Sequence, residues 1–180
     1  LSVGMMRHRD KLASYELIAE TLALLPDPQW QLQIAGDGPA RPEVEHVMSR
    51  FGSKVLFLGM LDRDALGVIY RQASVFVWPG VNEAFGMVYL EAQSHGIPVL
   101  AQDRPGLRDV VASWEFPALT PSPNSGPEGY AQALTQVLDD PALCDRQAKH
   151  VRSRVADRHL APVAAQRLWS ALSPLLEIPS

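Results

Sequence analysis

Cysteine is almost absent from this sequence, and long apolar runs are missing. The single cysteine, Cys144, excludes an internal disulfide and any zinc site that needs several thiolates. No apolar stretch reaches the roughly 18 residues of a membrane-spanning helix, and none has the composition of a secretory signal. The five histidines share no metal-ligand spacing. We therefore expect a soluble, cytoplasmic protein that uses no metal ion and no cofactor.

A strong excess of charge of either sign is also lacking. Sixteen Lys and Arg face twenty Asp and Glu, which gives a net charge of -4 and argues against a dedicated partner such as nucleic acid. The 180 residues, 47% of them hydrophobic, suffice for one core that buries roughly 70% of the unfolded surface. We expect a single domain over residues 1–180. Because residues 1–4 already resemble the end of a strand, we expect this domain to be a fragment of a longer protein.

Short β-branched or apolar runs alternate with longer segments of helical period, which is typical of βαβ units. The expected strands are 1–4, 31–35, 55–58, 74–78, 98–101 and, less clearly marked, 116–119. The expected helices are 12–25, 42–51, 63–72, 86–95, 107–112, 130–138, 141–157 and 163–176. Residues 121–127 are expected to form a turn-rich connector and residues 128–180 a helical tail. The pattern predicts an α/β fold, a Rossmann-like, doubly wound and mostly parallel sheet of six strands.

Ligands of a doubly wound sheet bind outside the carboxyl ends of its strands. The loops after Val3, Ala35, Leu58 and Trp78 are therefore expected to converge on one site.

The most informative segment is 79–92, the loop and helix after the fourth expected strand. If the helix begins near Phe85, the backbone N–H groups of Gly86, Met87 and Val88 lack partners within it, and the positive end of the helix dipole lies behind them. A diphosphate would satisfy these donors. Gly86 carries no side chain that would keep an anion away from the backbone.

Two glutamates belong to this segment. Glu83 lies just ahead of the helix, and Glu91 lies two turns inside a helix that is otherwise largely apolar. A carboxylate in a buried helix needs a partner, such as a pair of ribose hydroxyls or a cation. The alternatives are a first-turn acid that complements the helix dipole for Glu83, and a partly exposed helix residue for Glu91.

A basic cluster follows the first expected strand. Residues 4–11 include Arg7, His8, Arg9 and Lys11, with one acidic residue among them. Arg offers a planar fork and Lys a point charge to a phosphate. The alternative is a solvated loop.

Two glycine-bearing loops follow the next two expected strands. Gly36 and Gly38 resemble half of a dinucleotide fingerprint, but Arg41 stands where that motif requires Gly or Ala. This loop either borders a sugar or phosphate or is a plain turn. The segment Gly59-Met60-Leu61 either presents backbone groups to a nucleobase or is an ordinary strand-to-helix turn.

Together these residues resemble the C-terminal domain of GT-B glycosyltransferases of family 4, the group 1 glycosyltransferases. The strongest element is the segment 82–92 followed by Gly96-Ile97-Pro98-Val99, which is similar to the two family glutamates with seven residues between them. The resemblance covers most of the chain. It implies a retaining, metal-independent enzyme that transfers a sugar from a UDP-, GDP- or ADP-linked donor to an acceptor hydroxyl. This chain would supply the half that binds the donor.

By that resemblance Glu83 would bind hydroxyls of the transferred sugar, Glu91 the ribose, and the amides from Phe85 to Val88 the diphosphate. Lys11 matches a family lysine that holds the diphosphate. The chain departs from the family at Met5, where the family usually has Arg. We expect Arg7 or Arg9 to reach the phosphates in its place.

The resemblance also implies a missing N-terminal domain that binds the acceptor and makes any contact with the inner face of a membrane. The isolated chain is therefore expected to be inactive, and helix 163–176 to pack against that domain. Two other functions stay open. One is a non-catalytic nucleotide-binding or regulatory module, and the other is a GT-B nucleotide-sugar epimerase.

Overall fold

The computed structural model describes residues 1–26, 30–83, 85–108, 110–111 and 119–176. Its parallel strands form two ladders, one of β1 (Ser2–Val3), β2 (Leu32–Ala35) and β3 (Val55–Gly59), the other of β4 (Phe76–Val77) and β5 (Val99–Leu100). The Val77 N–H donates to the Leu1 carbonyl at 2.8 Å and thereby joins the ladders. The resulting order, β3-β2-β1-β4-β5, is that of a doubly wound sheet, with its reversal between β1 and β4.

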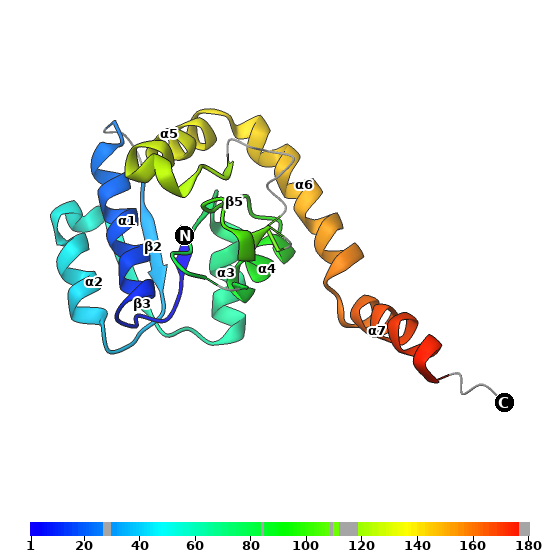
Figure 1. The fold of residues 1–180 in the computed structure, drawn as a ribbon. Helices are drawn as coiled ribbons and strands as arrows, with labels where there is room; N and C mark the ends of the chain where they lie inside the picture. Colours follow the sequence, from blue (N-terminus) through cyan, green and yellow to red (C-terminus); the bar gives the residue numbers. More distant parts are fainter. Residues whose placement is uncertain (27–29, 84, 109, 112–118, 177–180) are drawn as a thin grey trace.

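Seven α-helices accompany the strands within the described residues. They are α1 (Asp10–Leu24), α2 (Arg41–Met48), α3 (Arg63–Gln72), α4 (Met87–Ser94), α5 (Gly126–Asp139), α6 (Pro141–Arg158) and α7 (Ala161–Leu176). Helix α1 packs against α2 and α5, and α4 packs against α6. Helix α7 extends away from the rest of the chain (Figure 1). None of the helices in the described part is long and apolar enough to cross a membrane.

The core is built around β4, where Phe76 and the residue that follows the strand, Trp78, are fully buried. The rings of Tyr15 and Trp78 pack edge to face, with 5.0 Å between their centroids. Phe76 meets Tyr89 of α4 in the same way at 6.1 Å. Such edge-to-face pairs fix ring orientation as well as burying area. These two pairs hold the segment that precedes the candidate site against α1 and α4.

The sequence places the start of α3 correctly. Asp62 is extended, and its carboxylate accepts a hydrogen bond from the Ala65 N–H at 2.8 Å, which caps the helix. The predicted range, 63–72, is the observed one.

Removing the α3 cap gives a small, measurable loss of stability. Asp62→Ala is expected to lower the free energy of unfolding by about 1 kcal/mol, because the Ala65 N–H loses its acceptor. Asp64→Ala, in the first turn of the same helix, is the matched control for lost charge. Equal shifts of the two urea midpoints would show that the cap bond contributes nothing beyond charge.

The expected helix over 107–112 differs from the structure, and the expected sixth strand lies largely outside the described residues. The helix expected over 107–112 is replaced at its start by a 3₁₀ turn, Pro105–Leu107, since a segment this short cannot repay the cost of nucleating an α-helix. Residues 109 and 112 lie outside the described part of the chain, as do residues 116–118 of the expected sixth strand. Leu119, which ends that strand, accepts a hydrogen bond from the Ala101 N–H at 3.2 Å, as a neighbour of β5 would.

The expected connector is shorter than predicted. A 3₁₀ turn occupies Pro123–Ser125, and α5 begins at Gly126, inside the range assigned to the connector. Pro127 lies in the first turn of α5, where a missing N–H costs nothing and the fixed φ suits a helix. The proline that indicated a turn therefore belongs to the helix start.

Candidate functional site

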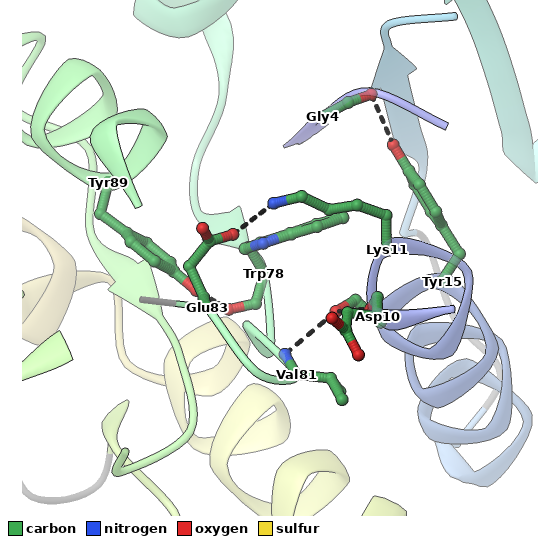
Figure 2. Close-up of polar contacts among 9 residues, drawn as sticks. Gly4, Asp10, Lys11, Tyr15, Trp78, Val81, Glu83 and Tyr89 are labelled. Carbon is green, nitrogen blue, oxygen red and sulfur yellow. Dashed lines mark hydrogen bonds and ion pairs between the residues drawn. The ribbon is translucent and has the colours of Figure 1, made fainter. Parts of the chain in front are cut away.

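The candidate site lies where the strand order reverses. The chain leaves β1 into the loop that precedes α1, and leaves β4 into the loop that precedes α4, so both loops meet at the carboxyl edge of the sheet. Lys11 of α1 and Glu83 of the second loop form an ion pair there (Figure 2). Their side chains are only 27% and 18% exposed. The structure thus brings together two residues that the sequence indicated separately.

Trp78 forms the floor beneath this pair. The Lys11 ammonium lies 5.3 Å from the centroid of the indole ring, within cation–π range. The Tyr15 hydroxyl donates to the Gly4 carbonyl at 3.0 Å and holds the end of β1 over α1 (Figure 2). A Cβ atom at Gly4 would lie 3.1 Å from the Trp78 ring, so glycine lets β1 and β4 approach closely here.

The first two turns of α1 hold the second loop at three consecutive residues. Val81 donates its N–H to the Ser14 hydroxyl at 3.1 Å, and the Asn82 amide donates to Asp10 at 2.8 Å. The Lys11–Glu83 pair is the third contact. Asn82 has a positive φ of 51°, a conformation that asparagine tolerates better than most residues. These contacts fix the position of the Glu83 backbone.

Asp10 and Ser14 were not recognised from the sequence. They lie one helical turn apart on α1 and flank Lys11, so all three face the same loop. That spacing next to the candidate lysine was the available signal. The loop that these residues contact could not be predicted from the spacing, because it lies about 70 residues further along the chain.

Tyr89 packs against the loop between β4 and α4. It is fully buried, and its hydroxyl donates to the Trp78 carbonyl at 3.1 Å. Burial raises the pKa of this phenol well above its ordinary value, so it remains a donor. A Cβ atom at Gly80 would lie 2.2 Å from the Tyr89 hydroxyl, and one at Gly86 would lie 2.4 Å from its ring. Both residues also have a positive φ, so glycine is the residue type that fits against the Tyr89 ring at these two positions.

The amino end of α4 lies later in the sequence than predicted. Gly86 is the N-cap, with φ 68° and ψ 66°, and the helix begins at Met87. Phe85 therefore precedes the helix, and its amide is not one of the helix-end donors. Phe85 and Met87 are 49% and 60% exposed, and Val88 is half-buried. The amides of Met87 and Val88 occupy the first turn, where no intrahelical acceptor is available.

Glu91 is not a buried carboxylate, contrary to the sequence-based expectation. It is exposed and accepts a 3.4 Å hydrogen bond from the Tyr70 hydroxyl of α3. Helix α4 is apolar in composition but buried on one face only, because Met87 and Glu91 share the outer face one turn apart. Burial, followed by the nearby Glu91 charge, raises the pKa of Tyr70, which stays a donor at neutral pH.

The loop after β1 passes so close to residues 36 and 38 that both must be glycine. A Cβ atom at Gly36 would lie 2.0 Å from the Gly4 carbonyl oxygen, and one at Gly38 would lie 2.3 Å from that of Met6. The Gly36 N–H donates to the Gly59 carbonyl at 2.7 Å. The loops after β1, β2 and β3 therefore lie side by side along the carboxyl edge of the sheet.

The expected nucleobase segment lies at the far side of this row of loops. Gly59 has a φ of 67°, Met60 is 81% exposed and Leu61 is half-buried. These residues follow β3, two strands away from β1, and lead directly into the Asp62 cap of α3. The geometry is that of an ordinary strand-to-helix turn that exposes one apolar side chain.

The basic cluster separates into one residue in the site and three outside it. Arg7 and Arg9 are exposed, and His8 lies 3.8 Å from Glu43. The Arg7 guanidinium makes no ion pair with a residue in the described ranges, whereas Lys11 does. Met5 is 53% exposed beside them. No group of three or more His, Cys, Asp or Glu that could hold a metal ion occurs among the residues that the structure places.

Comparison with known proteins assigns this arrangement to a family. The model of the family described as glycosyl transferases group 1 matches residues 2–154. A D-inositol 3-phosphate glycosyltransferase of Streptomyces avermitilis is 38% identical over 128 residues. The match covers 69% of this chain and 26% of that protein, so the chain spans about a quarter of the relative's length.

Solved structures agree on the fold. Sucrose-phosphate synthase from Thermosynechococcus elongatus superposes with a TM-score of 0.79 and 27% identity, over 97% of this chain and 45% of that one. Alr3699/HepE of Anabaena, in complex with UDP, superposes with a TM-score of 0.76 and 20% identity, over 96% of this chain and 48% of that one. The fold predicted from the sequence, a Rossmann-like half of a GT-B structure, is confirmed, and the chain belongs to the group 1 glycosyltransferases.

Proposed function

We propose that this chain is the donor-binding, C-terminal half of a retaining family 4 glycosyltransferase that uses a nucleotide-sugar. One observation carries the proposal. At the reversal of strand order, the ends of β1 and β4 place the cation of Lys11, the carboxylate of Glu83 and the amino end of α4 around one edge of the sheet. This is the part of a doubly wound fold where ligands bind.

The positive elements suit the diphosphate of the donor. Lys11 supplies a point charge, and the Met87 and Val88 amides supply the positive end of the α4 dipole. Together they would stabilise the negative charge that develops on the leaving nucleoside diphosphate, without a metal ion. Arg7 is exposed on the loop after β1 and is free to turn toward the same phosphates.

The two glutamates suit the hydroxyl groups of the donor. Glu83, held by the contacts of its loop with α1, would bind hydroxyls of the transferred sugar and orient it for reaction. Glu91 lies one turn further along α4, on its outer face beside Met87, where it would receive the ribose. Its exposure leaves the carboxylate accessible to that ligand.

The acceptor would be bound by a second domain. Each relative and structure compared above is more than twice as long as the part this chain matches. Helix α7 carries an exposed apolar surface of Leu168, Trp169 and Leu172, 60%, 65% and 41% exposed, which suits packing against such a domain. We propose that transfer takes place between the two domains in the cytoplasm, and that this chain alone does not catalyse it.

Nucleotide binding tests the proposal directly. In calorimetric titrations with UDP, GDP and ADP, we expect one nucleotide to bind saturably and thereby to identify the donor base. Glu91→Ala is expected to weaken that binding about tenfold, because a charge-assisted bond to the ribose is lost. Glu16→Ala on the outer face of α1 is the matched control and should change nothing. Binding that is indifferent to Glu91 would place the ribose elsewhere, and no binding by any of the three would contradict the proposal.

A second candidate, a non-catalytic nucleotide-binding module, is favoured by Met5. This exposed thioether stands in the loop before α1, where the family usually has arginine, so the positive field available to a leaving diphosphate would be weaker. Nucleotide binding without sugar transfer by the whole protein would select this function over the first.

A further inference from the structure

The indole N–H of Trp78 is a buried donor without a hydrogen-bond acceptor among the described residues. The side chain is 0% exposed and lies at the carboxyl end of β4, directly under the Lys11–Glu83 pair. Buried donors are nearly always paired, because leaving one unpaired sacrifices its hydrogen bond to water. The packing of the indole against Tyr15 and Gly4 fixes the ring in this orientation.

Glu83 is the nearby group that stands to lose its partner. Its side chain is only 18% exposed, and its carboxylate forms an ion pair with Lys11. If Lys11 moves to the diphosphate of a donor, the Glu83 carboxylate remains in a site of low exposure without that cation. An anion in such a place requires donors to replace the ones it has lost.

The unpaired donor and the released acceptor belong to one cluster. Lys11 contacts both the Trp78 ring and the Glu83 carboxylate, so its departure uncovers the indole and frees the carboxylate together. In Figure 2 the indole nitrogen is at the end of the ring that faces Glu83. With the loop held by α1, a rotation of the Glu83 side chain is the movement that a bond between the two groups requires.

We infer that Trp78 is a positioning residue for Glu83, and that its indole N–H donates to the Glu83 carboxylate once Lys11 engages phosphate. This inference rests on the proposed function and extends it by one residue. The Glu83 carboxylate thus changes its partner from the Lys11 ammonium to the Trp78 indole N–H. Because the ring is fixed, the new hydrogen bond orients Glu83 toward the sugar. The rigid indole in β4 makes the orientation reproducible at each binding event.

The chemical shift of the Trp78 indole proton, measured by NMR, tests whether Glu83 changes its partner in this way. The chain has four tryptophans, and replacement of Trp30, Trp114 and Trp169 one at a time by Phe assigns the Trp78 signal by elimination. We expect UDP, GDP or ADP, whichever binds, to move this signal downfield by more than any other indole signal. Glu83→Ala is expected to abolish that movement while nucleotide binding continues.

A second arm needs no nucleotide. Lys11→Met retains the apolar stem over the ring but removes the charge, which releases Glu83 permanently. The Trp78 signal of this variant is expected near its nucleotide-bound position, and the double variant Lys11→Met/Glu83→Ala is expected to return it to the free position.

The two arms separate the inference from the proposed function. A Trp78 signal that is unchanged by Lys11→Met, or changed equally when Glu83 is absent, overturns the inference whatever the nucleotides do. A signal that moves in Lys11→Met while no nucleotide binds overturns the proposed function, and the bond between indole and carboxylate still stands.

Discussion

Gly36→Ala is expected to lower the free energy of unfolding by roughly 4 kcal/mol, from backbone strain and overpacking together. The new Cβ atom would lie 2.0 Å from the Gly4 carbonyl oxygen, which belongs to backbone and cannot turn aside. The φ of 133° adds strain for any L-residue with a side chain. Since domains of this size are stable by only about 5–15 kcal/mol, urea unfolding should show a large shift of the midpoint.

Gly52→Ala is the matched control. Gly52 also has a positive φ, 56°, but a Cβ atom there meets nothing within 4 Å. This variant is expected to lose only about 1–2 kcal/mol, from backbone strain alone. Equal midpoints for the two variants would show that the loop after β1 yields to the added methyl group, and that the close approach of the two loops is not a constraint.

Glu83→Gln and Lys11→Met are expected to change nucleoside diphosphate affinity in opposite directions. Lys11 must leave Glu83 before it can bind a phosphate. Glu83→Gln removes that competitor, and the affinity should rise about fivefold, equal to roughly 1 kcal/mol. Lys11→Met removes the cation itself, and the affinity should fall about 10- to 100-fold, as for a lost charge-assisted bond. Calorimetry at fixed ionic strength measures both.

Glu20→Gln provides the charge control for this pair. Glu20 is exposed near the other end of α1, so it loses the same negative charge without touching the site. Its affinity should match that of the unaltered chain. If Glu83→Gln also binds the nucleotide more weakly, the carboxylate contacts the ligand directly and does not compete with it for Lys11.

Local signals in the sequence predicted local structure well. The α3 helix could be placed because Asp62, the apolar period and the following strand all indicate the same boundaries. Segment 105–112 was predicted less well, because a short run of mixed charged and apolar residues after proline and glycine fits either a helix or a tight turn. Proline near α5 was equally ambiguous, since it is common both in turns and in the first turn of a helix.

The sequence predicted that the loops after Val3 and Trp78 converge, but not which of their residues would pair. Lys11 and Glu83 stand out by type and position, but their pairing depends on β1 and β4 being neighbours, which periodicity does not reveal. The exposure of Glu91 could not be predicted from the sequence either. The composition of α4 is apolar, and only its packing against α6 decides which face stays open.

The position of β1 in the middle of the sheet has a consequence for how this domain folds during synthesis. On one side β1 pairs with β2, but its other neighbour follows much later, since Ser2 bonds to Val77 across 75 residues. At a synthesis rate of roughly 5–20 residues per second, that edge of the strand stays unpaired for about 4–15 seconds. Contacts this distant in sequence also slow the search for the native topology. The side of β1 that later pairs with β4 is therefore, in the newly synthesised chain, a strand edge open to pairing with the wrong strand.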